Sequence, residues 1–339
     1  MKNSRLILIP FSWLYGIIVR QRNRYYLSSD DNRFTIPVPS IVVGNLNLGG
    51  TGKTPFTEFL ISEFDDSTTA FLSRGYGRKT KGYLKVTKNA SSDTVGDEPL
   101  QMMLKAKEAH FHVCEDRTTG IKTILKNAPD TRLIILDDAY QHLKVKAQFY
   151  CLITRFDKLF YNDFIIPVGN LRENRKGAER ANAIIISKCP LSLTKSIKEK
   201  IILKIAKYSS APVYFSTINY SSLNTVTEAK LEPINTCLLT GIVSDQPIKD
   251  HLNSQGIKIL KHFRFKDHHN FSLIEIKAIV HFCLETNSRL ITTEKDWMRL
   301  SNFSTYISGI QIQTLPIKTE FLFDEQDLFM KQLRSFTIN

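Results

Sequence analysis

The chain has few of the features that mark a secreted or membrane-spanning protein. Only five of its 339 residues are cysteine, and no Cys-x-x-Cys pair occurs among them. This spacing predicts no disulfide framework, so we expect reduced core thiols in a cytosolic protein. The apolar stretch near the N-terminus is shorter than the roughly 20 residues that a membrane-spanning helix needs. The sequence also contains no internal repeat and no low-complexity tract.

Acidic residues are scarce relative to basic ones. Asp and Glu number 33 against 46 Lys and Arg, which gives a net charge of +13. This balance favours an anionic partner, either nucleic acid, anionic lipid or a phosphorylated substrate. The usual nucleic-acid-binding motifs are absent, so we expect no nucleic acid partner. A hydrophobic share of 42% is typical of a globular protein, and the length allows two lobes.

A glycine-rich segment follows the first buried strand that the sequence predicts. Residues 41–43 are apolar and β-branched, and the turn after them ends in Gly-Lys-Thr. Glycines let successive backbone N–H groups turn toward an anion, and the following helix adds the positive end of its dipole. In such a loop Lys53 reaches the β- and γ-phosphates of a nucleotide, and the Thr54 hydroxyl binds Mg²⁺. The predicted phosphate-binding residues are Asn47, Gly49, Gly50, Thr51, Gly52, Lys53 and Thr54.

Asn47 stands where the usual pattern G-x-x-x-x-G-K-[ST] has its first glycine. We expect the loop to close nevertheless, because asparagine tolerates a left-handed backbone better than most residues.

A second apolar run ends in two carboxylates. Residues 133–136 are Leu-Ile-Ile-Leu, and Asp137 and Asp138 follow them directly. Adjacent acids at the end of a buried strand are costly unless a metal or another cation pairs with them. The run therefore has the form of a Walker B strand, whose acid binds the Mg²⁺ of a nucleotide.

The N-terminal segment combines apolar, aromatic and basic residues. Residues 6–19 are almost wholly apolar and include Phe11 and Trp13, and three arginines follow at positions 20, 22 and 24. This composition predicts a helix over residues 1–28 that lies in the plane of an anionic membrane surface. The alternative is a helix that packs on the protein core and has a basic C-terminal end.

Strands and helices alternate along most of the chain, which predicts a doubly wound parallel sheet. We expect the core of this sheet in residues 29–220. Residues 221–235 are polar and weakly patterned, and we interpret them as a linker or hinge. Residues 236–339 are predicted to form a smaller α/β lobe. Within the core, a glycine-rich basic turn, residues 74–79, follows a predicted strand at the end where open α/β sheets bind ligands.

Several further motifs occur along the chain, and their combination is specific. They read Trp-Leu-Tyr-Gly, Ser-Arg-Gly-Tyr-Gly-Arg, Val-Gly-Asp-Glu-Pro, Leu-Asp-Asp-Ala-Tyr-Gln-His, Gly-Asn-Leu-Arg-Glu, Phe-Lys-Asp-His-His-Asn-Phe and Thr-Thr-Glu-Lys-Asp. Together with the glycine-rich loop, they span nearly the whole chain. In these motifs the chain resembles the tetraacyldisaccharide 4'-kinases, the lipid A kinases of Gram-negative bacteria. The loop of that family also lacks the first glycine, whereas Ala139 stands where the family usually has glycine.

The resemblance implies a P-loop NTPase-like core with a smaller C-terminal lobe and a cleft between them. It implies transfer of the ATP γ-phosphate, with Mg²⁺, to the 4'-hydroxyl of an acylated glucosamine disaccharide. The substrate lies in the inner leaflet of the cytoplasmic membrane, so the resemblance implies a peripheral location on its cytoplasmic face. No protein partner is implied.

The resemblance also assigns roles to individual residues. Asp97 carries over as the base, supported by His268, which we prefer to His269 because of its position in the motif. Asp97 could equally be a helix-capping acid, because it opens a predicted helix. The metal ligands that carry over are Thr54, Asp137, Asp138 and Glu173. We expect the substrate contacts to be Arg74, Tyr76, Asn170 and Arg172.

A different class of function shares several of these features. A membrane-associated P-loop ATPase that acts as a switch or partitioning factor would have the same loop, Walker B strand and N-terminal helix. A GTPase is not favoured, since the chain has no Asn-Lys-x-Asp motif for guanine.

Overall fold

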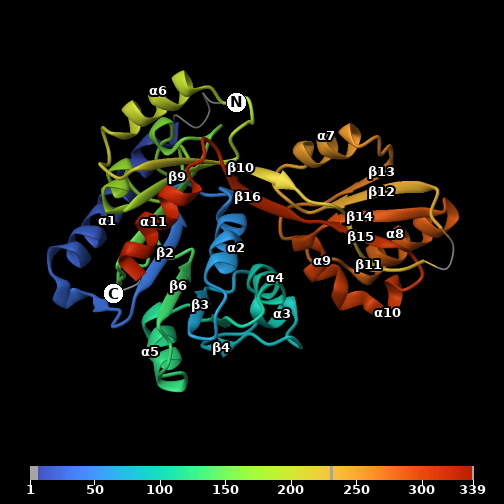
Figure 1. Cartoon of the computed structure of the whole chain (residues 1–339), viewed down its shortest axis with the longest axis horizontal. Coiled ribbons are helices and arrows are strands. Elements are labelled where there is room, and N and C mark those ends of the chain that lie inside the picture. The colour runs from blue at the N-terminus through green and yellow to red at the C-terminus, as the bar shows by residue number, and fades with distance from the viewer. Residues whose placement is uncertain (1–6, 230–231, 338–339) are drawn as a thin grey trace.

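The computed structural model describes residues 7–229 and 232–337, which form two lobes joined by a pair of strands (Figure 1). The larger lobe contains a nine-stranded sheet in the order β16-β10-β9-β8-β2-β6-β3-β5-β4. Strands β10 through β5 in this order run parallel, while β16 and β4 pair antiparallel at the two edges. The bounds of its strands are β2 Ser40–Asn45, β3 Thr69–Ser73, β4 Leu84–Lys85, β5 His110–Val113, β6 Leu133–Asp137, β8 Phe149–Arg155, β9 Ala183–Ser187, β10 Val213–Tyr220 and β16 Ile317–Phe321.

Helices cover both faces of this sheet, as a doubly wound fold requires. The helices of the larger lobe are α1 Ile9–Ser28, α2 Lys53–Glu63, α3 Ser92–Val95, α4 Asp97–Lys105, α5 Arg117–Asn127, α6 Lys195–Ile205 and α11 Gln326–Thr337. Apolar residues of α2, α4 and α11 pack on one face of the sheet, and those of α5 and α6 pack on the other. A short parallel pair, β1 Phe34–Thr35 with β7 Val145–Lys146, lies outside the main sheet.

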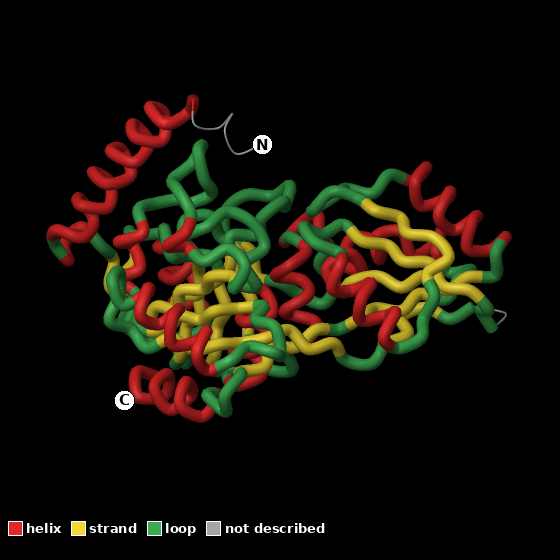
Figure 2. Tube along the Cα trace, turned by 90° about the horizontal axis from the view of Figure 1, so that it is seen from above, coloured by secondary structure: helices red, strands yellow, loops and turns green. Residues whose placement is uncertain are grey.

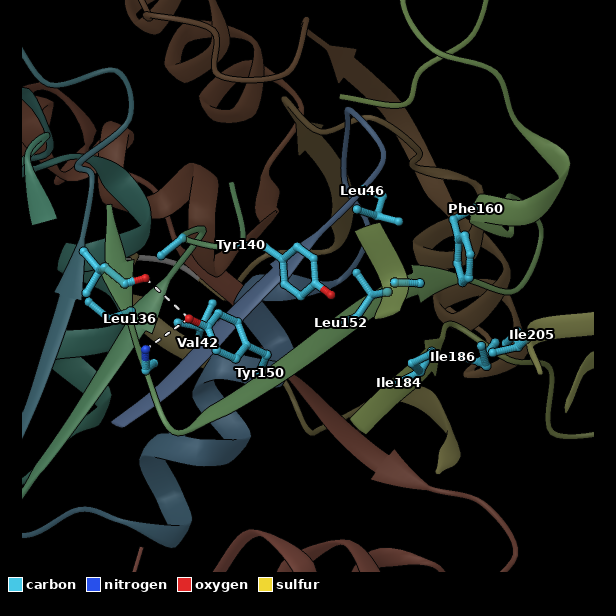
Figure 3. Close-up of a cluster of buried hydrophobic side chains, with 14 of the residues drawn as sticks. Val42, Leu46, Leu136, Tyr140, Tyr150, Leu152, Phe160, Ile184, Ile186 and Ile205 are labelled. Atoms are coloured by element: carbon cyan, nitrogen blue, oxygen red, sulfur yellow. Dashed lines mark hydrogen bonds between the residues drawn. The ribbon is translucent and has the colours of Figure 1, made fainter. Parts of the chain in front are cut away.

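Residue alternation along the strands explains why both faces need a cover. All six residues of β2 are buried: Val42 belongs to one core cluster, and its neighbours Ile41 and Val43 belong to the other. A strand that is buried on both sides has a nearly continuous run of β-branched residues. Figure 3 shows part of the first cluster, where Val42, Leu152 and Ile184 come from three adjacent strands.

The smaller lobe contains a five-stranded sheet in the order β11-β15-β14-β12-β13. Its elements are β11 Asn224–Thr227, β12 Asn235–Thr240, α7 Gln246–Ser254, β13 Ile259–Arg264, α8 Leu273–Glu285, β14 Ser288–Thr293, α9 Glu294–Leu300, α10 Ser304–Ile307 and β15 Ile312–Leu315. Helix α7 covers one face and α8 covers the other. Helix α8 begins with a capping box, in which Ser272 and Glu275 bind each other's backbone N–H groups.

The predicted domain boundaries need two corrections. The smaller lobe does not extend to the C-terminus, because β16 pairs with β10 and α11 contributes Phe329 and Leu333 to the core of the larger lobe. The predicted linker contains a strand, since β11 pairs with β15. Both differences arise because strands pair across long sequence separations, β16 with β10 and β11 with β15.

The lobes are joined where the chain crosses twice. Strand β10 leaves the larger lobe and β16 returns to it, and the two pair over five residues (Figure 1). Figure 2 shows the two sheets side by side with these strands between them. Because the crossing segments are hydrogen-bonded to each other, they form a continuous ribbon rather than two free linkers.

Helix α1 packs on the core along part of its length and leaves other apolar side chains exposed. Its arrangement therefore has features of both sequence interpretations, the core helix and the surface helix. It packs on the core through buried Val19, and the Ser12 hydroxyl donates to the Ile165 carbonyl at 3.0 Å. Other side chains remain exposed, among them Phe11 and Trp13, which are 64% and 71% exposed. No helix within the described ranges is both long enough and apolar enough to span a membrane.

All five cysteines lie in the described part of the chain, and each is a buried free thiol. This agrees with the prediction that they are reduced core residues.

Candidate active site

The glycine-rich loop connects β2 to α2 at the edge of the sheet where the parallel strands end. Its two left-handed positions are glycines, Gly49 with φ 96° and Gly52 with φ 86°. The left-handed residue Gly52 is the N-cap of α2, which places Lys53 at the first helical position. Local glycine chemistry therefore sets the turn that the sequence predicts.

Asn47 does not take the left-handed conformation that its position in the motif suggested. Its side chain instead donates to the Asp163 carboxylate at 3.0 Å, and its backbone forms an isolated bridge with Leu171. The closing of the loop thus rests on the glycines and on this tertiary anchor.

The end of β9 supports the loop from the other side. The Ser187 hydroxyl donates to the Thr51 carbonyl at 2.6 Å, and the Lys188 ammonium donates to the Gly50 carbonyl at 3.1 Å. Within the loop region, the Asn45 side chain donates to the Thr51 hydroxyl at 2.7 Å. These bonds engage the carbonyls of Gly50 and Thr51 and the Thr51 hydroxyl. The backbone N–H groups of such a loop are the ones that bind an anion.

Asp137 is the last residue of β6, which pairs with the strand before the loop, and Asp138 follows it directly. Asp137 is buried and accepts a hydrogen bond from the Thr57 hydroxyl at 3.0 Å. Burial, together with the charges of Glu98 and Asp138, raises the pKa of Asp137 to about 7. The raised pKa means that too little positive charge lies near Asp137 to stabilise its ionised form. A bound divalent cation would supply that charge.

Asp138 has a different environment from its neighbour. Its carboxylate lies 3.5 Å from the Lys53 ammonium and 3.2 Å from the Arg172 guanidinium. Burial alone would raise the pKa of Asp138, but the charges of Lys53 and Arg172 hold it below the usual value. The loop lysine and the Walker B acid therefore form one charged cluster.

Glu173 lies at the outer side of this cluster. Its carboxylate accepts from Arg180 at 2.8 and 2.9 Å, and from Asn23 of α1 at 2.8 Å. Gln141 also donates to it at 3.1 Å. In this arrangement both oxygens are engaged by protein groups, and the described residues contain no cluster of three or more metal-binding side chains. The resemblance implies a metal-ligand role for Glu173, whereas in the structure its carboxylate binds Arg180 and Asn23 of α1.

The structure brings Asp97 and His268 together from the two lobes. Asp97 is the first residue of α4, and His268 lies in the loop between β13 and α8. The His268 Nδ1 atom is 3.1 Å from one Asp97 oxygen, while the other oxygen accepts from the Glu98 amide at 2.9 Å. Asp97 thus binds an N-terminal amide of its helix with one oxygen, while the other faces His268 of the smaller lobe.

His269 points elsewhere. Its Nε2 atom is 3.1 Å from the Glu275 carboxylate, and its ring stacks on Phe265 with centroids 4.6 Å apart. His268 has a left-handed backbone with φ 56°, which turns successive side chains in different directions. The geometry therefore agrees with the choice of His268.

Positive charge surrounds the buried Asp97. Burial alone would raise the pKa of Asp97, but the hydrogen bond from His268 and the charges of Lys295 and Arg299 hold it below its usual value. This carboxylate is therefore ionised at neutral pH and able to accept a proton.

Two cations at the site had no role in the sequence analysis. Lys295 of α9 lies 2.9 Å from His268 Nε2, although its motif was noted only as part of the resemblance. Arg117 is 2% exposed and donates to the Asp137 carbonyl at 3.2 Å. Arg117 directly follows Asp116 at the start of a helix, just after a strand. This position in the sequence could have indicated that Arg117 belongs to the site.

The four expected substrate residues occupy different parts of the cleft. Arg74 and Tyr76 are exposed in the turn after β3, and the Tyr76 ring lies 5.0 Å from that of His268. Arg172 is bound to Asp138, whereas Asn170 donates to Asp163 and accepts from the Leu48 amide beneath the glycine-rich loop. Tyr76 is therefore the one of these four whose ring contacts His268.

Comparison with known proteins identifies the family of the chain. A family model described as Tetraacyldisaccharide-1-P 4'-kinase matches residues 4–337. Similar curated proteins named tetraacyldisaccharide 4'-kinase include one from Cytophaga hutchinsonii, 39% identical over 87% of this chain and 85% of its own length. Another, from Flavobacterium johnsoniae, is 38% identical over 96% of each chain.

A solved structure is similar over the whole length. It is described as the "apo" form of LpxK from Aquifex aeolicus in complex with ATP. The two chains are 27% identical, the TM-score is 0.76, and the match covers 98% of this chain and 99% of that one.

Proposed function

The chain belongs to the tetraacyldisaccharide 4'-kinase family, and we propose that its reaction proceeds at the junction of the two lobes. It is a lipid A kinase that transfers the γ-phosphoryl group of ATP to the 4'-hydroxyl of a tetraacyldisaccharide 1-phosphate. The alternative of an ATPase switch without a lipid substrate has no support among its relatives. The observation that carries the proposal is the hydrogen bond between Asp97 and His268 across the cleft.

Asp97 is the general base in this proposal. The 4'-oxygen forms a bond to the γ-phosphorus, the bond between that phosphorus and the bridging oxygen of ADP breaks, and Asp97 accepts the hydroxyl proton. His268 donates a hydrogen bond to Asp97 and so directs its basic oxygen at the hydroxyl. Because the pair spans both lobes, it is complete only when the lobes are close together.

The other groups hold and neutralise the nucleotide. The amides of the glycine-rich loop and the Lys53 ammonium bind the β- and γ-phosphates. Arg172, which already bonds Asp138, lies within the same charged cluster and can offset negative charge that develops on the phosphoryl group.

The residues present fit a Mg²⁺ ion. Asp137 and Asp138 supply hard oxygen donors, and Thr54, the second residue of α2, would supply a hydroxyl oxygen. One or two protein carboxylates are sufficient to hold Mg²⁺ in sites that also bind substrate phosphates. When bound, the ion would neutralise phosphate charge. Glu173 is left out of this proposal because its oxygens are engaged by Arg180, Asn23 and Gln141.

The test of this function is product analysis. The protein, ATP, Mg²⁺ and a tetraacyldisaccharide 1-phosphate in detergent micelles should give a lipid product heavier by one phosphoryl group, together with ADP. Chelation of Mg²⁺ should abolish the product, because the phosphate charge is then not neutralised. Label from the γ-phosphate should appear in lipid. Its appearance only as free phosphate would contradict the kinase proposal and indicate an ATPase.

We also propose that the protein docks on the inner leaflet through α1. Exposed apolar side chains gather on this helix, which lies along the outer edge of the larger lobe (Figure 2). Phe164, which is 62% exposed, lies in a loop that α1 contacts through Ser12 and Ile165. Three arginines on the same helix supply charge complementary to anionic lipid.

Replacing Phe11 and Trp13 by serine should lower binding to anionic vesicles at least tenfold. Each large apolar side chain removed from water contributes roughly 1.5–3 kcal/mol, and neither residue is part of the buried core. Co-sedimentation with vesicles measures the effect. The matched control is Leu203→Ser, which removes a 69% exposed apolar residue from α6. Equal binding by all three proteins would contradict the role of α1.

A further inference from the structure

Lys295 contacts the ring nitrogen of His268 that does not face Asp97. Its ammonium is 2.9 Å from His268 Nε2, while His268 Nδ1 faces Asp97 at 3.1 Å. The same ammonium is 3.1 Å from a Glu98 oxygen and 3.4 Å from an Asp267 oxygen. Both ring nitrogens of His268 therefore have a protein partner.

The charge of Lys295 decides which nitrogen carries the proton. Burial alone would lower the pKa of Lys295, but Glu98, Asp97 and Asp267 outweigh it and raise the pKa above its usual value. An ammonium has donors and no acceptor, so a ring nitrogen facing it must accept. His268 Nε2 is then unprotonated, and the ring proton sits on Nδ1 and is donated to Asp97.

We propose that Lys295 is a positioning residue that holds His268 as the neutral Nδ1–H tautomer, so that His268 orients Asp97 and does not carry its proton away. If the proton left Asp97 through the imidazole ring, Nε2 would have to release a proton to an acceptor. The group beside Nε2 is the Lys295 ammonium, which cannot accept one. After the hydroxyl proton reaches Asp97, it leaves from the carboxyl group itself. This inference rests on the proposed function, because it assumes that Asp97 is the base.

Charged or aromatic groups from several elements surround the His268 ring. Asp97, Glu98 and the Asp97 partner Arg299 come from α4 and α9, and Asp267 precedes His268 in its loop. The Tyr76 ring approaches from the turn after β3. Of the cations, Lys295 is the one whose ammonium lies within hydrogen-bond distance of the His268 ring, so the tautomer depends on it.

A purely structural role for Lys295 must be separated from this one, since it also ties the lobes together. Lys105 provides the matched control. It lies on the same α4–α9 interface, where its ammonium is 2.9 Å from Glu58 of α2 and 2.6 Å from Glu294, the neighbour of Lys295. It bridges the same lobes through the same kind of ion pair, and its two ion-pair partners are Glu58 and Glu294 rather than Asp97 or His268.

The experiment compares Lys295→Met, Lys295→Arg and Lys105→Met in full-length protein. Lys295→Met should lower kcat about tenfold to hundredfold, less than loss of the base itself, with unchanged ATP affinity. Lys295→Arg keeps a cation that only donates, so it should recover most of the activity. Lys105→Met should keep kcat within about twofold, because the catalytic pair is untouched.

Histidine-selective ¹⁵N NMR at neutral pH supplies the readout that a structural role would not move. The His268 signals, assigned by their absence in His268→Asn, should indicate the Nδ1–H tautomer in the wild type and in Lys295→Arg. In Lys295→Met, with Nε2 free beside an ionised carboxylate, they should shift toward the imidazolium form. His268→Asn itself should retain more activity than His268→Ala, because the asparagine amide can replace the Nδ1–H donor.

Two results would overturn the inference. One is an unchanged His268 tautomer in Lys295→Met. The other is an equal loss of kcat in Lys295→Met and Lys105→Met, which would make Lys295 an ordinary bridge between lobes. Failure of the proposed function is distinguishable, because the wild type would then form no phosphorylated lipid.

Discussion

Asp97→Ala should reduce kcat roughly 10²–10⁴-fold while ATP still binds with normal affinity. The carboxylate oxygen that faces His268 is the group that accepts the hydroxyl proton in the proposed mechanism. Because the other oxygen binds the Glu98 amide, the same substitution also removes a helix-terminal contact. That contact alone is worth about 1 kcal/mol of stability and would leave the chemistry intact. Steady-state kinetics, ATP titration and thermal melting together separate the two contributions.

The chain offers a control for the capping contribution. Asp116 is the N-cap of α5, where its side chain accepts from the Thr118 amide at 3.0 Å. Asp116→Ala should therefore lower the melting temperature by a similar amount with little change in kcat. If Asp97→Ala behaved like Asp116→Ala, Asp97 would be a helix cap and not a base.

The partnership of Asp97 and His268 can be tested in the same assay. His268→Ala should lower kcat less than Asp97→Ala does, because the carboxylate remains. The double variant should be little worse than Asp97→Ala alone, since residues that act as a unit have non-additive effects. Fully additive losses would show that the two side chains act independently despite the 3.1 Å contact.

Lys53→Ala should abolish measurable turnover and weaken ATP binding. A hydrogen bond to a charged group is worth about 1.5–3 kcal/mol, so the loss corresponds to roughly 10- to 150-fold in affinity. The effect on turnover should exceed the effect on binding, because Lys53 also neutralises charge that develops on the transferred group. Asp138 keeps its second partner, Arg172, so the fold at this site should persist.

Isothermal titration with ATP and the lipid kinase assay measure the two effects of Lys53→Ala. Lys195→Ala is the matched control, because Lys195 is an exposed first residue of another helix, α6. It should leave both ATP affinity and turnover unchanged. Near-normal turnover in Lys53→Ala would contradict the assignment of the loop as the phosphate site.

Features that depend on neighbouring residues could be read from the sequence. The apolar β-branched run of β2, the glycines at positions 49 and 52, and the apolar run of β6 before Asp137 have local signatures. Backbone conformational preferences and side-chain periodicity act over a few residues, so they are present in any stretch that is read alone. The same reasoning located the helix that begins at Asp97.

The catalytic arrangement was decided by tertiary structure. His268 meets Asp97 across 171 residues of sequence, and the packing of the smaller lobe on α4 places His268 on Asp97 while His269 contacts Glu275. The contact of Lys295 with His268 depends on the same packing. Likewise, Glu173 accepts a hydrogen bond from Asn23 because α1 packs against the larger lobe. The return of β16 and α11 to the larger lobe has the same cause. Such contacts depend on which surfaces bury each other, and no local pattern in the chain encodes that choice.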